Sequence, residues 1–97
     1  MDRTGRKLKI PDETAAVVRS MHPNLKRKIK SALQAILADP QAGKALKDEL
    51  EGLWSFRVGK LRVVYRITGK KKVLEIIAVG PRKNIYEETL RLIKKEK

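Results

Sequence analysis

The apolar residues change their spacing once along this chain, and that change constrains the fold more than any other feature. Up to about residue 38 they recur every three or four positions, as in Leu25, Ile29 and Leu33, which is the period of an α-helix. From about residue 53 they alternate with polar residues or gather in β-branched runs, as they do in β-strands. A chain of 97 residues has the length of one domain. We therefore expect residues 1–97 to form a single α+β domain with one core.

Two helices are expected in the first half of the chain. The first begins at Asp12, which is expected to cap it, and it stops before Pro23 because the residue that precedes a proline avoids helical backbone angles. The second helix continues to about Ala38. The short break between them, with His22 as a turn residue, predicts an antiparallel helical hairpin. One or two further helical turns are expected over residues 42–50.

Three segments rich in β-branched and aromatic residues follow, namely residues 53–58, 61–68 and 73–79. Turns that contain glycine separate them, so they predict a three-stranded antiparallel meander. Residues 1–9 are expected to be either an arm or an edge strand added to this sheet. A short C-terminal helix over about residues 83–95 completes the expected fold, an N-terminal helical hairpin packed on an antiparallel sheet. The apolar stripe of this last helix is expected to consist of Tyr86, Leu90 and Ile93.

The turn Gly59-Lys60 determines the register of the first strand pair, because a two-residue hairpin turn places Val58 opposite Leu61. Counting back along both strands then places Arg57 opposite Arg62. Side chains of a strand alternate between the two faces of a sheet, so one face is apolar and suited to the core. This face carries Trp54, Phe56, Val58, Leu61, Val63, Tyr65 and Ile67. The other face carries Ser55, Arg57, Arg62, Val64 and Arg66.

Two like charges directly opposite each other destabilise a sheet, so the pair Arg57 and Arg62 has two interpretations. Both side chains are exposed and diverge at little cost, or an anion lies between them, because guanidinium groups suit phosphate. The surrounding charge favours the anion. Residues 54–72 contain seven lysines and arginines and no acidic residue.

The overall charge indicates the class of partner. The chain has 24 basic and 11 acidic residues, a net charge of +13, which points to a polyanion or an acidic protein. It has no cysteine and one histidine, which excludes disulfides, thiol catalysis and histidine-based zinc sites. No cofactor or metal is expected. No apolar run approaches the ~18 residues of a membrane-spanning helix, so we expect a cytoplasmic protein without a membrane partner.

Tyr86 also has two interpretations. It follows Arg82 by four residues, so in a helix the two would share a face. Either Tyr86 only attaches the last helix to the sheet, or it works with the arginines. A site made of arginines and one tyrosine suits phosphodiester chemistry, because arginine stabilises charge that develops on phosphorus and a tyrosine can transfer a proton.

Two motifs connect the chain to a known family. After two predicted helices come GLWSFRVGKLRVVYRI (52–67) and VLEIIAVGPRKNIYEE (73–88). In this order they resemble the RelE/ParE superfamily of toxin–antitoxin toxins, over about residues 12–93. The resemblance implies a RelE-like fold. Members of the RelE branch are ribosome-dependent endoribonucleases that inhibit translation by cutting messenger RNA, through attack of a 2′-hydroxyl on the adjacent phosphate without a metal.

The resemblance also implies roles for single residues. Arg57 and Arg62 would bind and stabilise the scissile phosphate, Arg82 would stabilise the phosphate or the leaving group, and Tyr86 would be the general base. The remaining bases expected to bind RNA or the ribosome are Lys60, Arg66, Lys70, Lys71, Lys72, Lys83, Lys26 and Lys30. The chain departs from the family pattern at two positions: Ser55 stands where one branch has a lysine, and Pro81 stands where a histidine is common.

Other functions fit the same residues. The ParE branch has this fold and poisons DNA gyrase, and a basic nucleic-acid-binding module is a further alternative. The arginines and tyrosine together favour the nuclease. The expected partners are messenger RNA, the ribosome and a cognate antitoxin, acidic and partly disordered when free, which would neutralise the basic surface. The last helix of the family can be displaced by the antitoxin, so residues 83–97 are expected to be the least protected element of the free protein.

Overall fold

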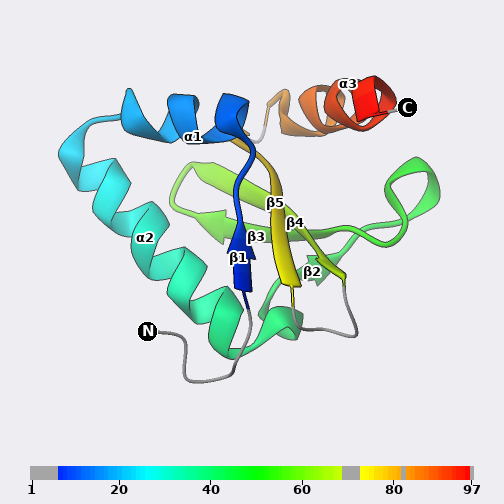
Figure 1. Ribbon diagram of the computed structural model, residues 1–97, viewed down its shortest axis with the longest axis horizontal. Helices are drawn as coiled ribbons and strands as arrows, with labels where there is room; N and C mark the ends of the chain where they lie inside the picture. The colour runs from blue at the N-terminus through cyan, green and yellow to red at the C-terminus, as the bar shows by residue number, and fades with distance from the viewer. Residues whose placement is uncertain (1–6, 69–72, 82, 97) are drawn as a thin grey trace.

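A five-stranded sheet with helices on both faces forms the molecule, as the computed structural model in Figure 1 shows. The structure describes residues 7–68, 73–81 and 83–96. The elements in chain order are β1 (Lys7–Lys9), α1 (Asp12–Arg19), α2 (Pro23–Ala38), the 3-10 turn η1 (Pro40–Ala42), β2 (Lys44–Ala45), the 3-10 turn η2 (Asp48–Leu50), β3 (Trp54–Val58), β4 (Leu61–Thr68), β5 (Val73–Pro81) and α3 (Ile85–Glu96). The expected α+β architecture is confirmed.

The strands lie in the order β1-β5-β4-β3-β2. The predicted antiparallel meander is β3, β4 and β5, and the N-terminal segment adds β1 as an edge strand, parallel to β5. The prediction of helical turns over residues 42–50 is wrong in part. The 3-10 turn η2 lies in this segment and η1 ends at its first residue, but the strand β2 separates the two turns and pairs antiparallel with Trp54 and Ser55.

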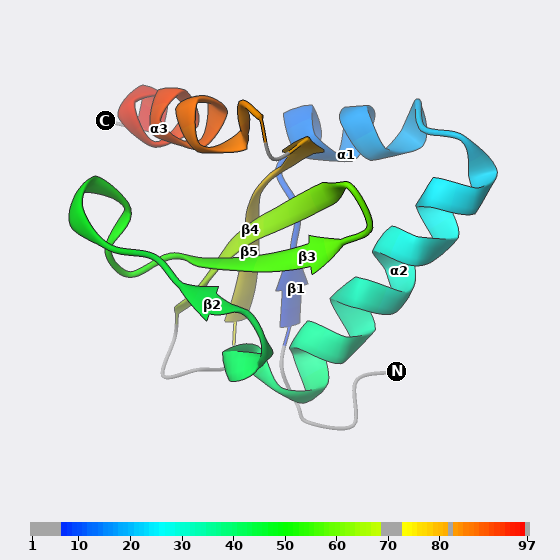
Figure 2. The ribbon, with the colours of Figure 1, turned by 180° about the vertical axis from the view of Figure 1, so that it is seen from behind.

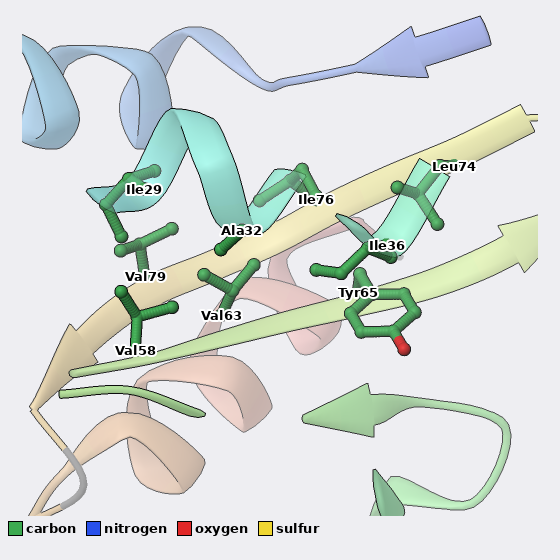
Figure 3. Packing of buried hydrophobic residues seen from close by; sticks show 9 residues of the cluster. All are labelled: Ile29, Ala32, Ile36, Val58, Val63, Tyr65, Leu74, Ile76 and Val79. Atoms are coloured by element: carbon green, nitrogen blue, oxygen red, sulfur yellow. The ribbon is translucent and has the colours of Figure 1, made fainter. Parts of the chain in front are cut away.

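The predicted apolar face of the hairpin is confirmed. Val58, Val63 and Tyr65 are buried against α2, where they meet Ile29 and Ile36. The other four predicted residues pack at the margin of the same cluster: Trp54, Phe56, Leu61 and Ile67. Figure 3 shows the buried members interlocking between α2 and the sheet, with the Tyr65 hydroxyl pointing away from the rest of the cluster.

A second apolar cluster lies on the opposite face of the sheet, contrary to the expectation of one core. Val64 of β4 and both Ile77 and Ala78 of β5 are buried there against Ile85 of α3. The register shifts by one residue between Val64 and Tyr65, opposite this part of β5. This bulge allows two consecutive residues of β5 to contribute to the same cluster. Consequently α3 is packed on the sheet and is not a loose appendage.

The predicted stripe of α3 is displaced by one position. Ile85 and Thr89 are its fully buried residues, whereas Tyr86, Leu90 and Ile93 are only half-buried. Thr89 can take a core position because its hydroxyl donates to the carbonyl of Ile85 at 2.7 Å. A polar residue at a core position cannot be recognised from apolar spacing alone.

The two predicted N-terminal helices are present, but Figure 2 shows them diverging from their connection and not lying side by side as the predicted antiparallel hairpin. Pro11 occupies the N-cap position of α1, and Asp12 is the first helical residue, so the predicted Asp12 cap is wrong. His22 caps α2, because its Nδ1 accepts from the Asn24 N–H at 3.1 Å. Within residues 7–68, 73–81 and 83–96, no helix is both long and apolar enough to cross a membrane.

Candidate functional site

The tip of the β3–β4 hairpin has the predicted register, with Arg57 opposite Arg62. Gly59 adopts a φ of +60°, which the tight turn needs and which glycine adopts without strain. The two guanidinium groups diverge. Nε of Arg57 donates to the carbonyl of Gly59 at 3.2 Å, toward the tip, whereas Nη1 of Arg62 donates to Oγ of Ser55 at 3.4 Å, away from the tip. This divergence relieves the repulsion between the two charges and gives each arginine a different environment.

Ser55 connects Arg62 to the next strand. It is 2% exposed, and its cross-strand partner in β2 is Lys44. Directly paired residues project to the same face of a sheet. The direct partner of Ser55 in β4 is Val64, and Arg62 lies diagonally from Ser55, two residues before Val64 on the same face. Arg62, Ser55 and Lys44 therefore form a diagonal row across β4, β3 and β2, on the face that α3 covers. We call these three residues the cationic row.

A buried tyrosine determines where β2 lies. The Tyr65 hydroxyl donates to the carbonyl of Pro40 at 2.6 Å and accepts from the N–H of Gly43 at 3.1 Å. A Cβ atom on Gly43 would lie 2.6 Å from the Tyr65 oxygen and 2.9 Å from the carbonyl oxygen of Ser55, so only glycine fits. Burial raises the pKa of the Tyr65 hydroxyl, which keeps it protonated as a donor. We call this arrangement the Tyr65 latch, and it places Lys44 beside Ser55.

Tyr86 lines a pocket of about 350 Å³ between the start of α3 and the β2 segment. The other lining residues are Lys44, Ala45, Leu46, Lys47, Asp48 and Leu50. Lys44 therefore belongs both to the cationic row and to this tyrosine pocket. Tyr86 also packs against the second apolar cluster, so its attachment of α3 to the sheet and its place in a pocket are compatible.

Lys44 and Lys47 are site residues that the sequence analysis missed. They lie in a segment, residues 31–53, in which acidic residues outnumber basic ones by two. Charge counting therefore directs attention away from them. Their approach to Tyr86 depends on the fold of the whole 39–50 segment, and no local sequence signal marks it.

The other predicted bases are in different settings. Arg66 is half-buried and forms an ion pair with Glu75 at 2.6 Å, so its charge is balanced locally. Lys60 is exposed at the turn, and Lys83 is exposed just before α3. Lys26 and Lys30 are exposed on α2, which covers the opposite face from the cationic row. The structure thus brings Lys60 near the arginine pair but separates the bases of α2 from it.

Arg82 and Lys70, Lys71 and Lys72 lie outside the described residues. The shared face of Arg82 and Tyr86 therefore stays a prediction; among the described residues, α3 begins at Ile85. Among the residues that the structure describes, no three histidine, aspartate or glutamate side chains gather in a cluster that could hold a metal ion.

Two further hollows adjoin the hairpin. A pocket of about 230 Å³ at the tip is lined by Arg57, Gly59, Lys60, Leu61 and Arg62. A groove of about 440 Å³ separates α2 from β3, and its walls include Ala32, Ala35, Phe56 and Val58. The cationic residues at this groove are Arg27, Lys28 and Arg57. Arg57 thus lines both hollows, whereas Arg62 lines only the one at the tip.

Comparison with known families gives a match over most of the chain. The model of the ParE-like toxin of type II bacterial toxin–antitoxin systems matches residues 8–90. No curated protein sequence matches the chain.

Solved structures of toxins share the fold. The free E. coli toxin RelE, in a variant with two arginines replaced by alanine, is similar with a TM-score of 0.74 and 18% identity, covering 91% of this chain and 97% of that one. A chain of the Mycobacterium tuberculosis RelBE2 toxin–antitoxin complex has a TM-score of 0.69 and 24% identity, covering 79% and 98% respectively. A YoeB/ParE toxin from Agrobacterium tumefaciens has a TM-score of 0.68 and 24% identity, covering 78% and 98%. At these identities the likeness establishes the fold alone.

Proposed function

The chain belongs to the ParE-like toxin family of type II bacterial toxin–antitoxin systems, and on that premise we propose that it is a ribosome-dependent endoribonuclease that cuts messenger RNA. The cut requires no metal ion and inhibits translation. One observation supports the proposal most strongly. The guanidinium of Arg62 is hydrogen-bonded to Ser55, and the strand partner of Ser55, Lys44, lines the basic pocket that contains Tyr86.

These groups suit transesterification of RNA. The 2′-oxygen attacks the adjacent phosphorus, the bond from phosphorus to the 5′-oxygen breaks, and a cyclic 2′,3′-phosphate remains. Tyr86 takes the proton of the attacking 2′-hydroxyl, and a water molecule protonates the departing 5′-oxygen. Arg62 stabilises the negative charge that develops on the phosphate oxygens in the transition state. The resemblance assigns Arg82 to this charge as well.

The partner is proposed to be an antitoxin with an acidic segment. Solved relatives include toxin–antitoxin complexes, such as RelBE from E. coli and RelE–RelB from Pyrococcus horikoshii. The net charge of +13 suits an acidic chain, and the groove between α2 and β3 combines apolar walls with three cationic residues. An antitoxin segment in that groove would also contact Arg57, which lines it.

Inhibition of DNA gyrase is the second candidate, favoured by the matching family model, which is named for ParE. This candidate needs the fold and a binding surface but no reacting groups. The geometry favours the nuclease, because the tyrosine pocket shares Lys44 with the cationic row that holds Arg62.

A reconstituted translation reaction separates the two candidates. Ribosomes are paused on a defined message, and cleavage is mapped by primer extension for the wild type, for Arg62→Ala and for a ribosome-free reaction. The proposal expects a cut in the A-site codon only with wild-type protein and ribosomes. No cut by a folded wild-type protein, together with inhibition of gyrase supercoiling, would replace the nuclease by the second candidate.

A further inference from the structure

We propose that Lys44 binds an RNA phosphate next to Arg62, and that Ser55 is the positioning residue that holds Arg62 there. This inference rests on the proposed function and names two residues of its site that neither the family motifs nor the comparisons assign. It is carried by the register of β2 on β3, by the burial of Ser55 and by the direction of Arg62.

Ser55 has the properties of a positioning residue. A hydroxyl that is buried needs a hydrogen-bond partner, and the partner here is Nη1 of Arg62 at 3.4 Å. Arg62 is half-buried, whereas Arg57, its cross-strand neighbour, is exposed and bonded to the Gly59 carbonyl. Without Ser55, the guanidinium of Arg62 loses the contact that draws it away from Arg57. Repulsion from Arg57 alone would not determine where the Arg62 guanidinium points. The hydrogen bond to Ser55 directs it toward β3.

Lys44 lies close enough to Ser55 to supply a second positive charge to a phosphate that Arg62 binds. Cα atoms of directly opposite residues in antiparallel strands are about 4.5–5.5 Å apart, so the backbone of Lys44 lies one strand away from the hydroxyl that Arg62 contacts. Its side chain is exposed, and in the described part of the chain no carboxylate forms an ion pair with it. Lys47 and Asp48 also line the tyrosine pocket. A guanidinium fork and an ammonium group together suit a phosphate diester.

The position of Lys44 is built into the fold. The preceding residue, Gly43, is bonded to the Tyr65 hydroxyl and packs so closely on Ser55 that a Cβ atom would collide with it. A surface lysine on a free loop would have no such constraint. The Tyr65 latch therefore fixes the backbone from which the Lys44 side chain reaches the phosphate.

The first test measures binding of a 2′-O-methyl RNA trinucleotide, which cannot be cleaved, to the full-length protein at several salt concentrations. Loss of one phosphate contact to a single strand lowers the slope of log K against log salt by about 0.7. We expect this decrease for Lys44→Ala and, separately, for Arg62→Ala. Arg19→Ala, which removes an exposed positive charge from α1, is the matched control and is expected to leave the slope unchanged. Equal slopes for Lys44→Ala and Arg19→Ala would overturn the assignment of Lys44.

The second test addresses Ser55 through the Nε–Hε signal of Arg62 in nuclear magnetic resonance spectra. Ser55→Ala is expected to increase the mobility of this group and to weaken trinucleotide binding without changing the salt slope, because no charge is lost. Ser55→Thr, which keeps the hydroxyl, is expected to restore both properties. Unchanged backbone amide signals of β3 and β4 confirm that the sheet is intact. An equally ordered Arg62 in Ser55→Ala would contradict the positioning role.

Neither test depends on cleavage, so the two proposals fail separately. Cleavage on ribosomes by a Lys44→Ala protein at the wild-type rate, with wild-type trinucleotide binding, would remove this inference and leave the nuclease in place. Salt-sensitive binding through Lys44 and Arg62 without any cleavage would support the inference about the phosphate site and remove the nuclease.

Discussion

At the scale of single residues, the arginine pair shows which features of the site local sequence patterns predict and which they do not. The turn Gly59-Lys60 and strict alternation were sufficient to predict that Arg57 lies opposite Arg62, and the register confirms it. The direction of each side chain could not be predicted, because it depends on a carbonyl at the tip and on the hydroxyl of Ser55. The two guanidinium groups have different hydrogen-bond partners, and only that of Arg62 reaches toward the β2 side of the sheet. Both side chains nevertheless line the pocket at the tip, and an anion bound between them stays a prediction.

The Tyr65 latch predicts that removal of the Tyr65 hydroxyl lowers the stability of the folded protein. Tyr65→Phe leaves the carbonyl of Pro40 and the N–H of Gly43 without their partner, and an unsatisfied buried group costs about 1–3 kcal/mol. We expect the free energy of unfolding in urea to fall by about that amount. Tyr86→Phe, which removes a hydroxyl that forms no hydrogen bond within the described residues, is the control and should change stability much less.

Tyr65 also predicts a pH dependence. Burial raises its pKa above the ordinary value of 10.0, so the folded state binds the phenolic proton more tightly than the unfolded chain does. This contribution to stability is complete below pH 10 and is lost as the pH rises through the folded-state pKa. The wild type is therefore expected to lose more stability above pH 10 than Tyr65→Phe, as measured by urea unfolding at each pH. Parallel curves for the two proteins would contradict the burial of this hydroxyl.

Gly43→Ala tests the close packing under Lys44. The added methyl group would collide with the Tyr65 oxygen and with the Ser55 carbonyl, and overpacking of this kind costs about 1–3 kcal/mol. Because β2 has to move, we expect weaker trinucleotide binding in addition to a lower urea midpoint. Ala42→Ser, an exposed change in the preceding turn, is expected to leave both unchanged.

At the scale of elements, the sequence was informative wherever periodicity extends over several residues. The two N-terminal helices, the meander and the C-terminal helix all have that property, and all are present. The strand β2 has two residues and is held in place by Tyr65, which lies two strands further along the chain, so neither propensity nor spacing predicts it. The tyrosine pocket was missed for the same reason, since two of its residues come from this strand.

The attachment of α3 predicts how the free protein opens. Arg91 contacts Glu13 of α1 at 2.8 Å and also Glu88 within α3, and all three side chains are about half exposed. Exposed ion pairs contribute little, so the packing of Ile85 and Thr89 is the main attachment. We expect residues 83–96 to exchange amide hydrogens faster than β4 and β5, and Arg91→Ala to accelerate them modestly further, with Lys94→Ala as the control. Protection of α3 equal to that of β4 would contradict this expectation.

The same contact has a pH dependence. Hydrogen bonding to Arg91 lowers the pKa of Glu88 below its ordinary value of 4.5. The contribution to α3 stability is therefore present above that value and is lost as the pH falls through the lowered pKa. Hydrogen exchange of α3, corrected for its intrinsic pH dependence, is expected to rise relative to β5 as the pH is lowered below 4.5. In Arg91→Ala this additional rise should be absent.

At the scale of the whole molecule, the two faces of the sheet differ in what they hold. The face toward α2 holds the larger core, and the face toward α3 holds a smaller one, with the cationic row and the tyrosine pocket at its margin. The net charge of +13 predicted a polyanionic or acidic partner but not where on the surface it binds. The bases of α2, of the Arg66–Glu75 pair and of the cationic row contribute equally to that net charge, although of these only Lys44 lines the pocket that contains Tyr86.

The rate of A-site cleavage on paused ribosomes, measured in a single turnover, tests the central claim most directly. We expect Arg62→Ala to lower this rate by about a hundredfold or more, because removing a donor from a developing oxyanion costs about 10²–10³ in rate. Arg57→Ala, whose guanidinium points to the tip, is expected to lower it less. Equal cleavage by the wild type and Arg62→Ala, or no cleavage by either folded protein, would contradict the assignment of nuclease activity to this face of the sheet.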